Sequence, residues 1–122
     1  MKIDRNKVHE KYDKHCGYCG KEISVKEMQV DHIIPKWLLT SNQFKDAVTF
    51  EQIHNEENYM PACRRCNHYK READIEGFRE KLKTLHKRVV SHYIGKVAID
   101  YGIVQIIPFN GVFYFETYNQ NK

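Results

Sequence analysis

The sequence predicts a small α+β domain. Residues 22–34 are rich in β-branched side chains and predict one or two short strands, and the apolar residues after Asp74 have the spacing of a helix. A C-x-x-C pair lies on each side of the strand region. The chain has 122 residues, of which 41% are hydrophobic, and a core of this size often needs an additional staple.

The cysteines predict that this staple is a zinc ion. They form two matched pairs, C-G-Y-C and C-R-R-C. Each pair has the spacing of a zinc knuckle, and two pairs together supply four thiolates to one tetrahedral, closed and therefore structural Zn²⁺ site. Redox-active or inert cysteines are the less favoured alternatives. Gly17 and Gly20 suit the tight turn of the first knuckle. The predicted zinc ligands are Cys16, Cys19, Cys63 and Cys66.

The N-terminal half is expected to contain only short elements. No apolar run approaches a membrane span and residues 1–16 lack the apolar segment of a signal peptide, so we expect a soluble, cytoplasmic protein without a membrane partner. Residues 3–14 predict a short helix, and Pro35 ends the strand region. Residues 36–57 form an insertion in which helical turns are expected near 37–39 and 48–53.

The C-terminal half is expected to contain a long helix and a β-hairpin. One helix starts near Arg64, and apolar residues in steps of three and four predict another from Asp74, its N-cap, to about Tyr93. Asn110-Gly111 between two apolar segments predicts a hairpin with a type I′ turn. We therefore expect a core of residues 1–74 and a helix and hairpin, 75–122, that pack on it as one domain.

Several polar residues around the second cysteine pair resemble a known family. The run V-D-H-I-I-P at 30–35, then Asn58, then C-R-R-C-N with Lys70 occur in the order found in the HNH endonucleases. The resemblance covers roughly residues 12–74. It implies a ββα-metal core with an Asp-His pair on the first strand and a final Asn or His on the helix.

Phosphodiester hydrolysis explains why these residue types occur together. The reaction needs a deprotonated water, neutralisation of the phosphoryl charge and stabilisation of the leaving alkoxide. A neutral histidine such as His32 suits the first task, and Asp31 and Asn67 carry the oxygens that Mg²⁺-like ions prefer. The resemblance assigns the same roles, with Asn58 orienting the His32 ring. Lys70, one helical turn beyond Asn67, is expected to hold a phosphate.

Some features of the predicted site remain open at this point. Neighbouring residues of a regular strand face opposite sides, so Asp31 and His32 share one site only if the strand bends or ends there. His68 is an alternative to Asn67 as the ligand, and Arg71 stands where some HNH proteins carry a further histidine ligand. The expected catalytic ion is Mg²⁺ or Mn²⁺, with Ni²⁺ as a third candidate.

The expected partner is DNA. The net charge of +4 favours anionic partners only weakly. The resemblance adds that small HNH proteins of this kind occur in phages and in restriction systems. A non-catalytic zinc module that binds nucleic acid or a protein is the alternative function, and a redox-sensing thiol protein is a third. Neither alternative requires Asp31, His32 or Asn67.

Overall fold

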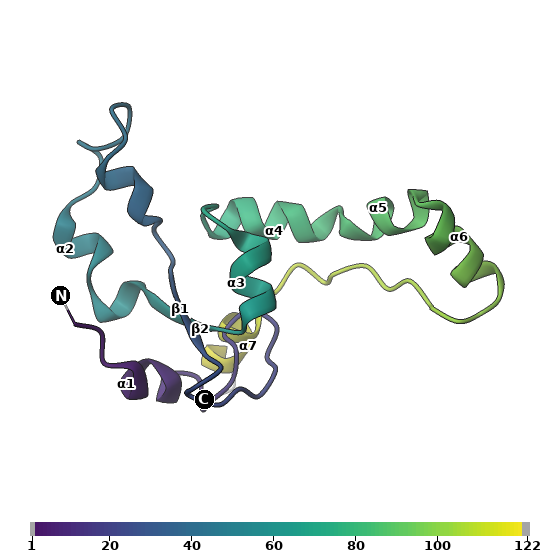
Figure 1. Ribbon diagram of the computed structural model, residues 1–122, viewed down its shortest axis with the longest axis horizontal. Coiled ribbons are helices and arrows are strands. Elements are labelled where there is room, and N and C mark those ends of the chain that lie inside the picture. Colours follow the sequence, from purple (N-terminus) through teal and green to yellow (C-terminus); the bar gives the residue numbers. More distant parts are fainter. Residues whose placement is uncertain (1, 121–122) are drawn as a thin grey trace. The chain divides into compact units, whose positions relative to one another are not determined.

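The computed structural model describes residues 2–120, which divide into two compact units (Figure 1). The first unit consists of the residues up to Ile75 together with those from Phe113 onwards, and the second unit is Glu76–Val112. The division lies one residue beyond the boundary expected at 74, while the end of the chain belongs to the first unit. None of the helices within residues 2–120 has the length and apolarity that a membrane crossing requires.

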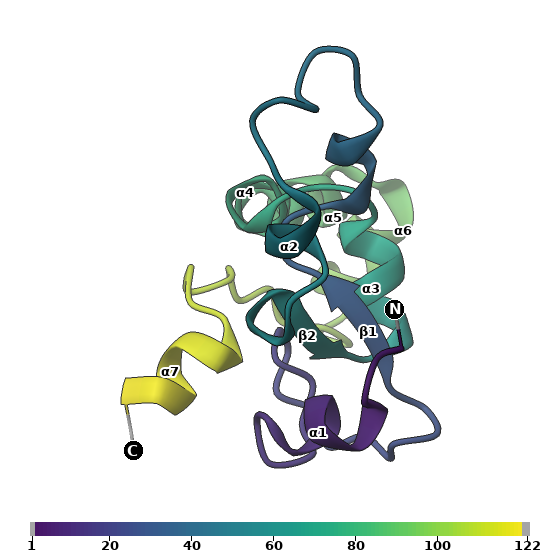
Figure 2. The same ribbon diagram turned by 90° about the vertical axis from the view of Figure 1, so that its left-hand side faces the viewer.

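Two short antiparallel strands form the centre of the first unit (Figure 2). Strand β1 is Gln29–His32 and strand β2 is Tyr59–Ala62, with Asp31 opposite Met60 and His32 opposite Tyr59. Every residue of β2 is buried. Helix α3, Arg64–Lys70, starts directly after β2 and contacts β1. The first unit is thus a mixture of helices and a small sheet, as the predicted α+β class requires.

Helix α1, Arg5–Glu10, lies within the short helix expected at 3–14. It starts where the Asp4 side chain accepts a hydrogen bond from the Lys7 backbone N–H at 3.2 Å. Just beyond its end, the Lys11 ammonium donates to the carbonyl oxygens of Glu56 at 2.9 Å and Tyr59 at 2.8 Å. These bonds attach the helix to the start of β2.

The insertion between the strands contains the expected helical turns. The 3₁₀ turn η1 is Lys36–Leu39, and helix α2 is Phe50–Ile53. A reciprocal capping box of Thr49 and Gln52 fixes the start of α2. A second 3₁₀ turn, η2 (Glu56–Asn58), leads into β2.

The prediction of one continuous helix from Asp74 to Tyr93 is wrong. The structure has α4 (Ile75–Lys83), α5 (Leu85–Ser91) and α6 (Tyr93–Asp100) instead. The chain is extended at His92, with φ −77° and ψ 139°, and α6 turns back against α5. A Cβ atom on Gly95 would lie 2.2 Å from the Val89 carbonyl oxygen, so this close approach requires a glycine.

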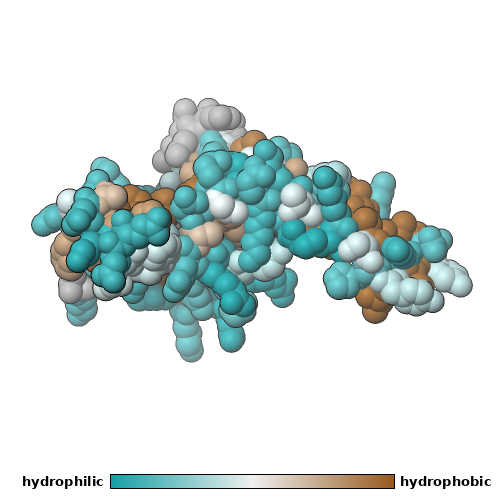
Figure 3. Space-filling model, turned by 90° about the horizontal axis from the view of Figure 1, so that it is seen from above, coloured by the Kyte–Doolittle hydropathy of each residue, from teal (hydrophilic) through white to brown (hydrophobic). Residues whose placement is uncertain are grey.

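The second unit exposes apolar side chains on α6 and on the segment that follows it (Figure 3). Ile94, Ile103 and Ile107 are among its most exposed large residues. The apolar spacing that predicts helices here therefore does not correspond to one continuous buried face.

The predicted C-terminal hairpin is wrong, because Tyr114–Gln120 forms helix α7 and residues 103–113 contain no strand. A type I′ turn needs positive φ at both central residues, and only Gly111, with φ 88°, has it. The Val112 N–H instead donates to the Asn110 side chain at 3.0 Å. The apolar residues of the expected second arm pack on the first cysteine pair, where the Phe115 N–H donates to the Gly17 carbonyl at 2.7 Å.

Candidate functional site

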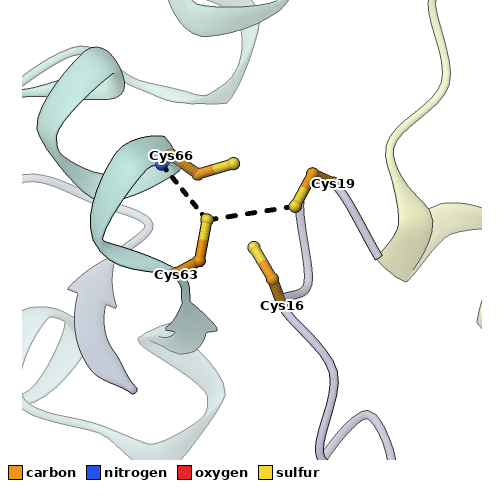
Figure 4. A group of neighbouring side chains, drawn as sticks. All are labelled: Cys16, Cys19, Cys63 and Cys66. Atoms are coloured by element: carbon orange, nitrogen blue, oxygen red, sulfur yellow. Dashed lines mark hydrogen bonds between the residues drawn. The ribbon is translucent and has the colours of Figure 1, made fainter. Parts of the chain in front are cut away.

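The four cysteines converge on one point of the first unit (Figure 4). All four sulfur atoms lie within 4.8 Å of one another, and the Sγ atoms of Cys19 and Cys63 are 3.9 Å apart. Zn–S bonds of about 2.3 Å place tetrahedral sulfurs about 3.8 Å apart, so the cluster has the size and the donor atoms that a Zn²⁺ ion requires.

Local backbone structure directs the sulfurs inward. Cys63 is the N-cap of α3, and its Sγ accepts a hydrogen bond from the Cys66 N–H at 3.4 Å. In the first knuckle, the Gly20 N–H donates to the Cys16 carbonyl at 2.9 Å, with Gly20 at φ 81°. The Gly17 N–H donates to the Pro61 carbonyl at 2.8 Å, which joins this knuckle to β2.

The thiols interact strongly with one another. Hydrogen bonds from Cys16 and Cys66 lower the pKa of Cys19 to about 3. Hydrogen bonds to Cys16 and Cys19, together with burial, raise the pKa of the Cys66 thiol. One thiolate is therefore stabilised by its protonated neighbours, whereas several adjacent thiolates need a cation between them. The chemistry of this cluster fits zinc.

A second group of polar residues lies where β1 ends. The strand ends at His32, which is the condition under which Asp31 and His32 can share one site. Both residues line a pocket of about 290 Å³. Asn67 of α3 lines the same pocket. The structure thus brings three of the predicted site residues together from two elements that are distant in sequence.

Asp31 is held through one of its carboxylate oxygens. The residue is 6% exposed, and its Oδ2 atom accepts a hydrogen bond from the Tyr18 hydroxyl at 2.5 Å. The Lys70 ammonium lies 3.0 Å from the same oxygen. Burial raises the pKa of Asp31, and the contacts with Tyr18 and Lys70 oppose this rise. Within residues 2–120, no side-chain donor contacts Oδ1.

The His32 ring makes edge contacts and no hydrogen bond within the described part of the chain. Its centroid lies 5.3 Å from that of Tyr59 and 5.8 Å from that of His54. Burial, followed by the charges of Lys36, His54 and Lys70, lowers the pKa of His32 to about 4. The ring is therefore neutral at pH 7 and has no internal partner for its basic nitrogen.

Asn67 is oriented by the strand beside it. Its Nδ2 atom donates to the Gln29 side chain at 2.6 Å, and no donor in residues 2–120 contacts its Oδ1 atom. His68 lines a different pocket, together with Arg64 and Arg65. Of the two candidate ligands, Asn67 is the one that lies beside Asp31.

Asn58 holds the segment that follows β1. Its Oδ1 atom accepts from the Ile34 N–H at 2.7 Å, and its Nδ2 atom donates to the carbonyls of Ile34 at 3.2 Å and Ile53 at 2.8 Å. These bonds use both amide protons, and none of them goes to the His32 ring. The structure therefore connects Asn58 to His32 through the backbone and not through the expected side-chain bond.

Lys70 lies one turn beyond Asn67, as predicted, but points into the protein. It is 1% exposed, so its ammonium faces Asp31 and not solvent. Lys36 and Arg71, which the sequence did not assign, are instead the exposed cations that line the pocket. Their places, directly after Pro35 and four residues beyond Asn67, are the signals that could have identified them.

Two further histidines, His9 and His54, lie in different surroundings. His9 is buried and bonds to the Ile23 carbonyl at 2.6 Å, so its role is structural. The ring of His54 lies edge-on to that of His32. Tyr18, the contact of Asp31, was missed although it lies between the two cysteines of the first knuckle.

These features define a small zinc-knuckle domain with a second polar pocket between a strand end and a helix. Residues 16–72 match the family model described as HNH endonuclease. The match confirms the resemblance found in the sequence, and the four-cysteine cluster fits the zinc-knuckle type of the family. The match suggests nuclease activity in general. Neither the curated proteins nor the solved structures gave a match to the chain.

Proposed function

We propose that this protein is a DNA endonuclease of the ββα-metal type, which hydrolyses phosphodiester bonds with a histidine base and one divalent cation. The observation that carries the proposal is the single pocket lined by Asp31, His32 and Asn67. These side chains lie within the segment that matches the HNH family. The order β1, β2, α3 is that of a ββα core.

Two side-chain oxygens are available for the cation. The Oδ1 atoms of Asp31 and Asn67 have no side-chain donor within residues 2–120. One carboxylate and one amide oxygen suit Mg²⁺ or Mn²⁺, with Ni²⁺ as a third candidate, and leave other coordination positions open. Such an ion, when bound, neutralises charge on the phosphoryl oxygens and stabilises the leaving alkoxide.

His32 removes the proton from the attacking water in this proposal. A general base must be unprotonated and must have a free lone pair, and the half-buried imidazole, which makes no hydrogen bond within the described residues, has both properties. The T-shaped contacts with Tyr59 and His54 limit rotation of the ring. Asn58 contributes by fixing the backbone at Ile34, two residues beyond His32.

Lys36 and Arg71 bind the phosphate in this proposal, in place of the buried Lys70. Both are exposed at the pocket, and neither has an acidic partner in the described residues. Arg71 has a positive φ of 56°, a strained conformation for a residue with a side chain, at the C-terminal end of α3. We expect Arg71→Ala to raise KM more than it lowers kcat, because Arg71 contacts the phosphate in the ground state as well as in the transition state.

The test is cleavage of supercoiled plasmid in EDTA, Mg²⁺, Mn²⁺ and Ni²⁺. His32→Ala should keep its zinc, its fold and its DNA binding, and should lose about 10²- to 10⁴-fold in cleavage rate. Asn67→Ala should lose its response to added metal, whereas His68→Ala, on the same helix but outside the pocket, is the matched control. A His32→Ala variant that cleaves normally would contradict the assignment.

The alternative functions give different results in the same assay. A non-catalytic zinc module would bind plasmid but leave it intact with every metal. A redox-sensing thiol protein would show no dependence on Asp31 or His32 and would release zinc on oxidation. The nuclease proposal requires cleavage that EDTA abolishes and that one of the three added metals restores.

A further inference from the structure

We propose that Tyr18, a residue of the first zinc knuckle, is a positioning residue for Asp31 and couples the zinc site to the catalytic cation. This inference rests on the proposed function, since it takes Asp31 as a ligand of that cation. Its basis is a buried contact between the two sites that does not depend on the family resemblance.

Tyr18 and Lys70 both contact the same oxygen of Asp31, and no side-chain donor in the described residues contacts the other. The Tyr18 hydroxyl donates a hydrogen bond to Asp31 Oδ2 at 2.5 Å. The Lys70 ammonium lies 3.0 Å from the same atom. Because Oδ2 accepts the Tyr18 hydrogen bond and forms an ion pair with the Lys70 ammonium, rotation of the carboxylate is restricted.

The zinc ligands determine where these two donors lie. Tyr18 stands between Cys16 and Cys19 in C-G-Y-C, and Lys70 follows Cys66 by four residues, about one turn, on α3. Each donor therefore belongs to one of the two cysteine pairs that the zinc ion joins. Zinc binding thus fixes both donors relative to β1, which carries Asp31.

Packing gives the Tyr18 ring a single orientation. The ring is buried, and its centroid lies 5.4 Å from that of Phe113 and 6.3 Å from that of Phe115, both in edge-to-face geometry. The Tyr18 carbonyl also accepts a hydrogen bond from the Tyr114 N–H at 3.1 Å. The C-terminal segment therefore supports the residue that supports Asp31.

The test measures direct binding of Mn²⁺ to the zinc-loaded protein without DNA. The electron paramagnetic resonance signal of free Mn²⁺ reports how much of the ion remains unbound. Tyr18→Phe removes the hydroxyl and keeps the ring that packs on Phe113. We expect it to retain one zinc per chain and to weaken Mn²⁺ binding about 10- to 100-fold, the usual effect of losing a group that orients a metal ligand. Lys70→Met should weaken binding in the same way.

Tyr12→Phe is the matched control. Tyr12 is also buried and also packs against Phe115, with ring centroids 6.2 Å apart, but it does not touch Asp31. It should bind Mn²⁺ as the wild type does. Equal Mn²⁺ affinity of Tyr18→Phe and the wild type would overturn the proposal, and so would a wild-type protein that binds no Mn²⁺.

The result separates this inference from the proposed function. If the protein cleaves no DNA but Tyr18→Phe weakens Mn²⁺ binding, the nuclease assignment fails and the coupling stands. If the wild type cleaves DNA and Tyr18→Phe binds Mn²⁺ normally and cleaves at the wild-type rate, the coupling fails and the nuclease assignment stands.

Discussion

Asn58→Ala should destabilise the first unit more than any single surface change nearby. Asn58 is 5% exposed and makes three hydrogen bonds to backbone groups of Ile34 and Ile53. The Ile53 carbonyl belongs to a fully buried residue, and leaving it unpaired costs about 1–3 kcal/mol. Ile34 is half-buried, so water can replace its two lost bonds in part, at about 0.5–1.5 kcal/mol each.

These contributions add up to a loss of about 2–6 kcal/mol in the free energy of unfolding. A domain of about 60–100 residues loses about 4–8 °C in Tm for each kcal/mol, so the melting temperature should fall by at least about 8 °C. The single tryptophan, Trp37, lies in the same unit, where its indole N–H donates to the Glu72 carbonyl at 2.9 Å. Its fluorescence during heating therefore reports the unfolding of this unit.

Asn55→Ala is the matched control for this prediction. Asn55 is exposed, and its side chain accepts one hydrogen bond, from the Glu57 N–H at 2.9 Å, as the N-cap of η2. Its loss typically costs about 1 kcal/mol. If Asn58 acted only by orienting the His32 ring, Asn58→Ala would lose cleavage and keep its melting temperature. A drop in Tm no larger than that of Asn55→Ala would refute the structural reasoning.

Three further predictions follow from the zinc site and from charge. Cys63→Ser should contain less than one zinc per chain by elemental analysis and melt far below the wild type or precipitate, since zinc contributes on the order of 10 kcal/mol to small domains. Gly20→Ala should lower the melting temperature by more than the roughly 4 °C that its φ of 81° alone requires, because the new Cβ would lie 2.7 Å from the Tyr114 ring; a fall smaller than about 4 °C contradicts this. DNA binding measured by anisotropy should weaken with salt, with a log–log slope of about −0.9 per phosphate contacted, and a flat response would exclude backbone binding.

The sequence predicted best those elements whose causes are local. Helix α1, the two helical turns of the insertion and the start of α3 depend on caps, prolines and spacings within a few residues, so they can be recognised without tertiary structure. The convergence of the cysteines was also predictable, because a metal ion requires its ligands to meet wherever they lie in the chain.

The two errors in the C-terminal half have a common physical cause. The Asn110-Gly111 pair and the apolar spacing after Asp74 are local sequence patterns. Such patterns do not determine how the surrounding side chains pack in the folded protein. Phe113 is buried against Tyr18 in the first unit, and a hairpin is not needed to bury it. The break at His92 likewise depends on the close approach of α6 to Val89, a contact that periodicity does not specify.

The misplacement of Lys70 shows how the same physics could have corrected the prediction. An ionised carboxylate at a buried strand position needs a partner, because its desolvation is costly. Asp31 therefore required a cation or strong donors from elsewhere in the fold, and α3, which packs on β1, presents Lys70 to it. Helical spacing correctly placed Lys70 one turn from Asn67, but only the burial of Asp31 decides that the ammonium turns inward. Lys70 therefore pairs with the carboxylate, and the proposed function assigns the phosphate contacts to Lys36 and Arg71, which are exposed at the pocket.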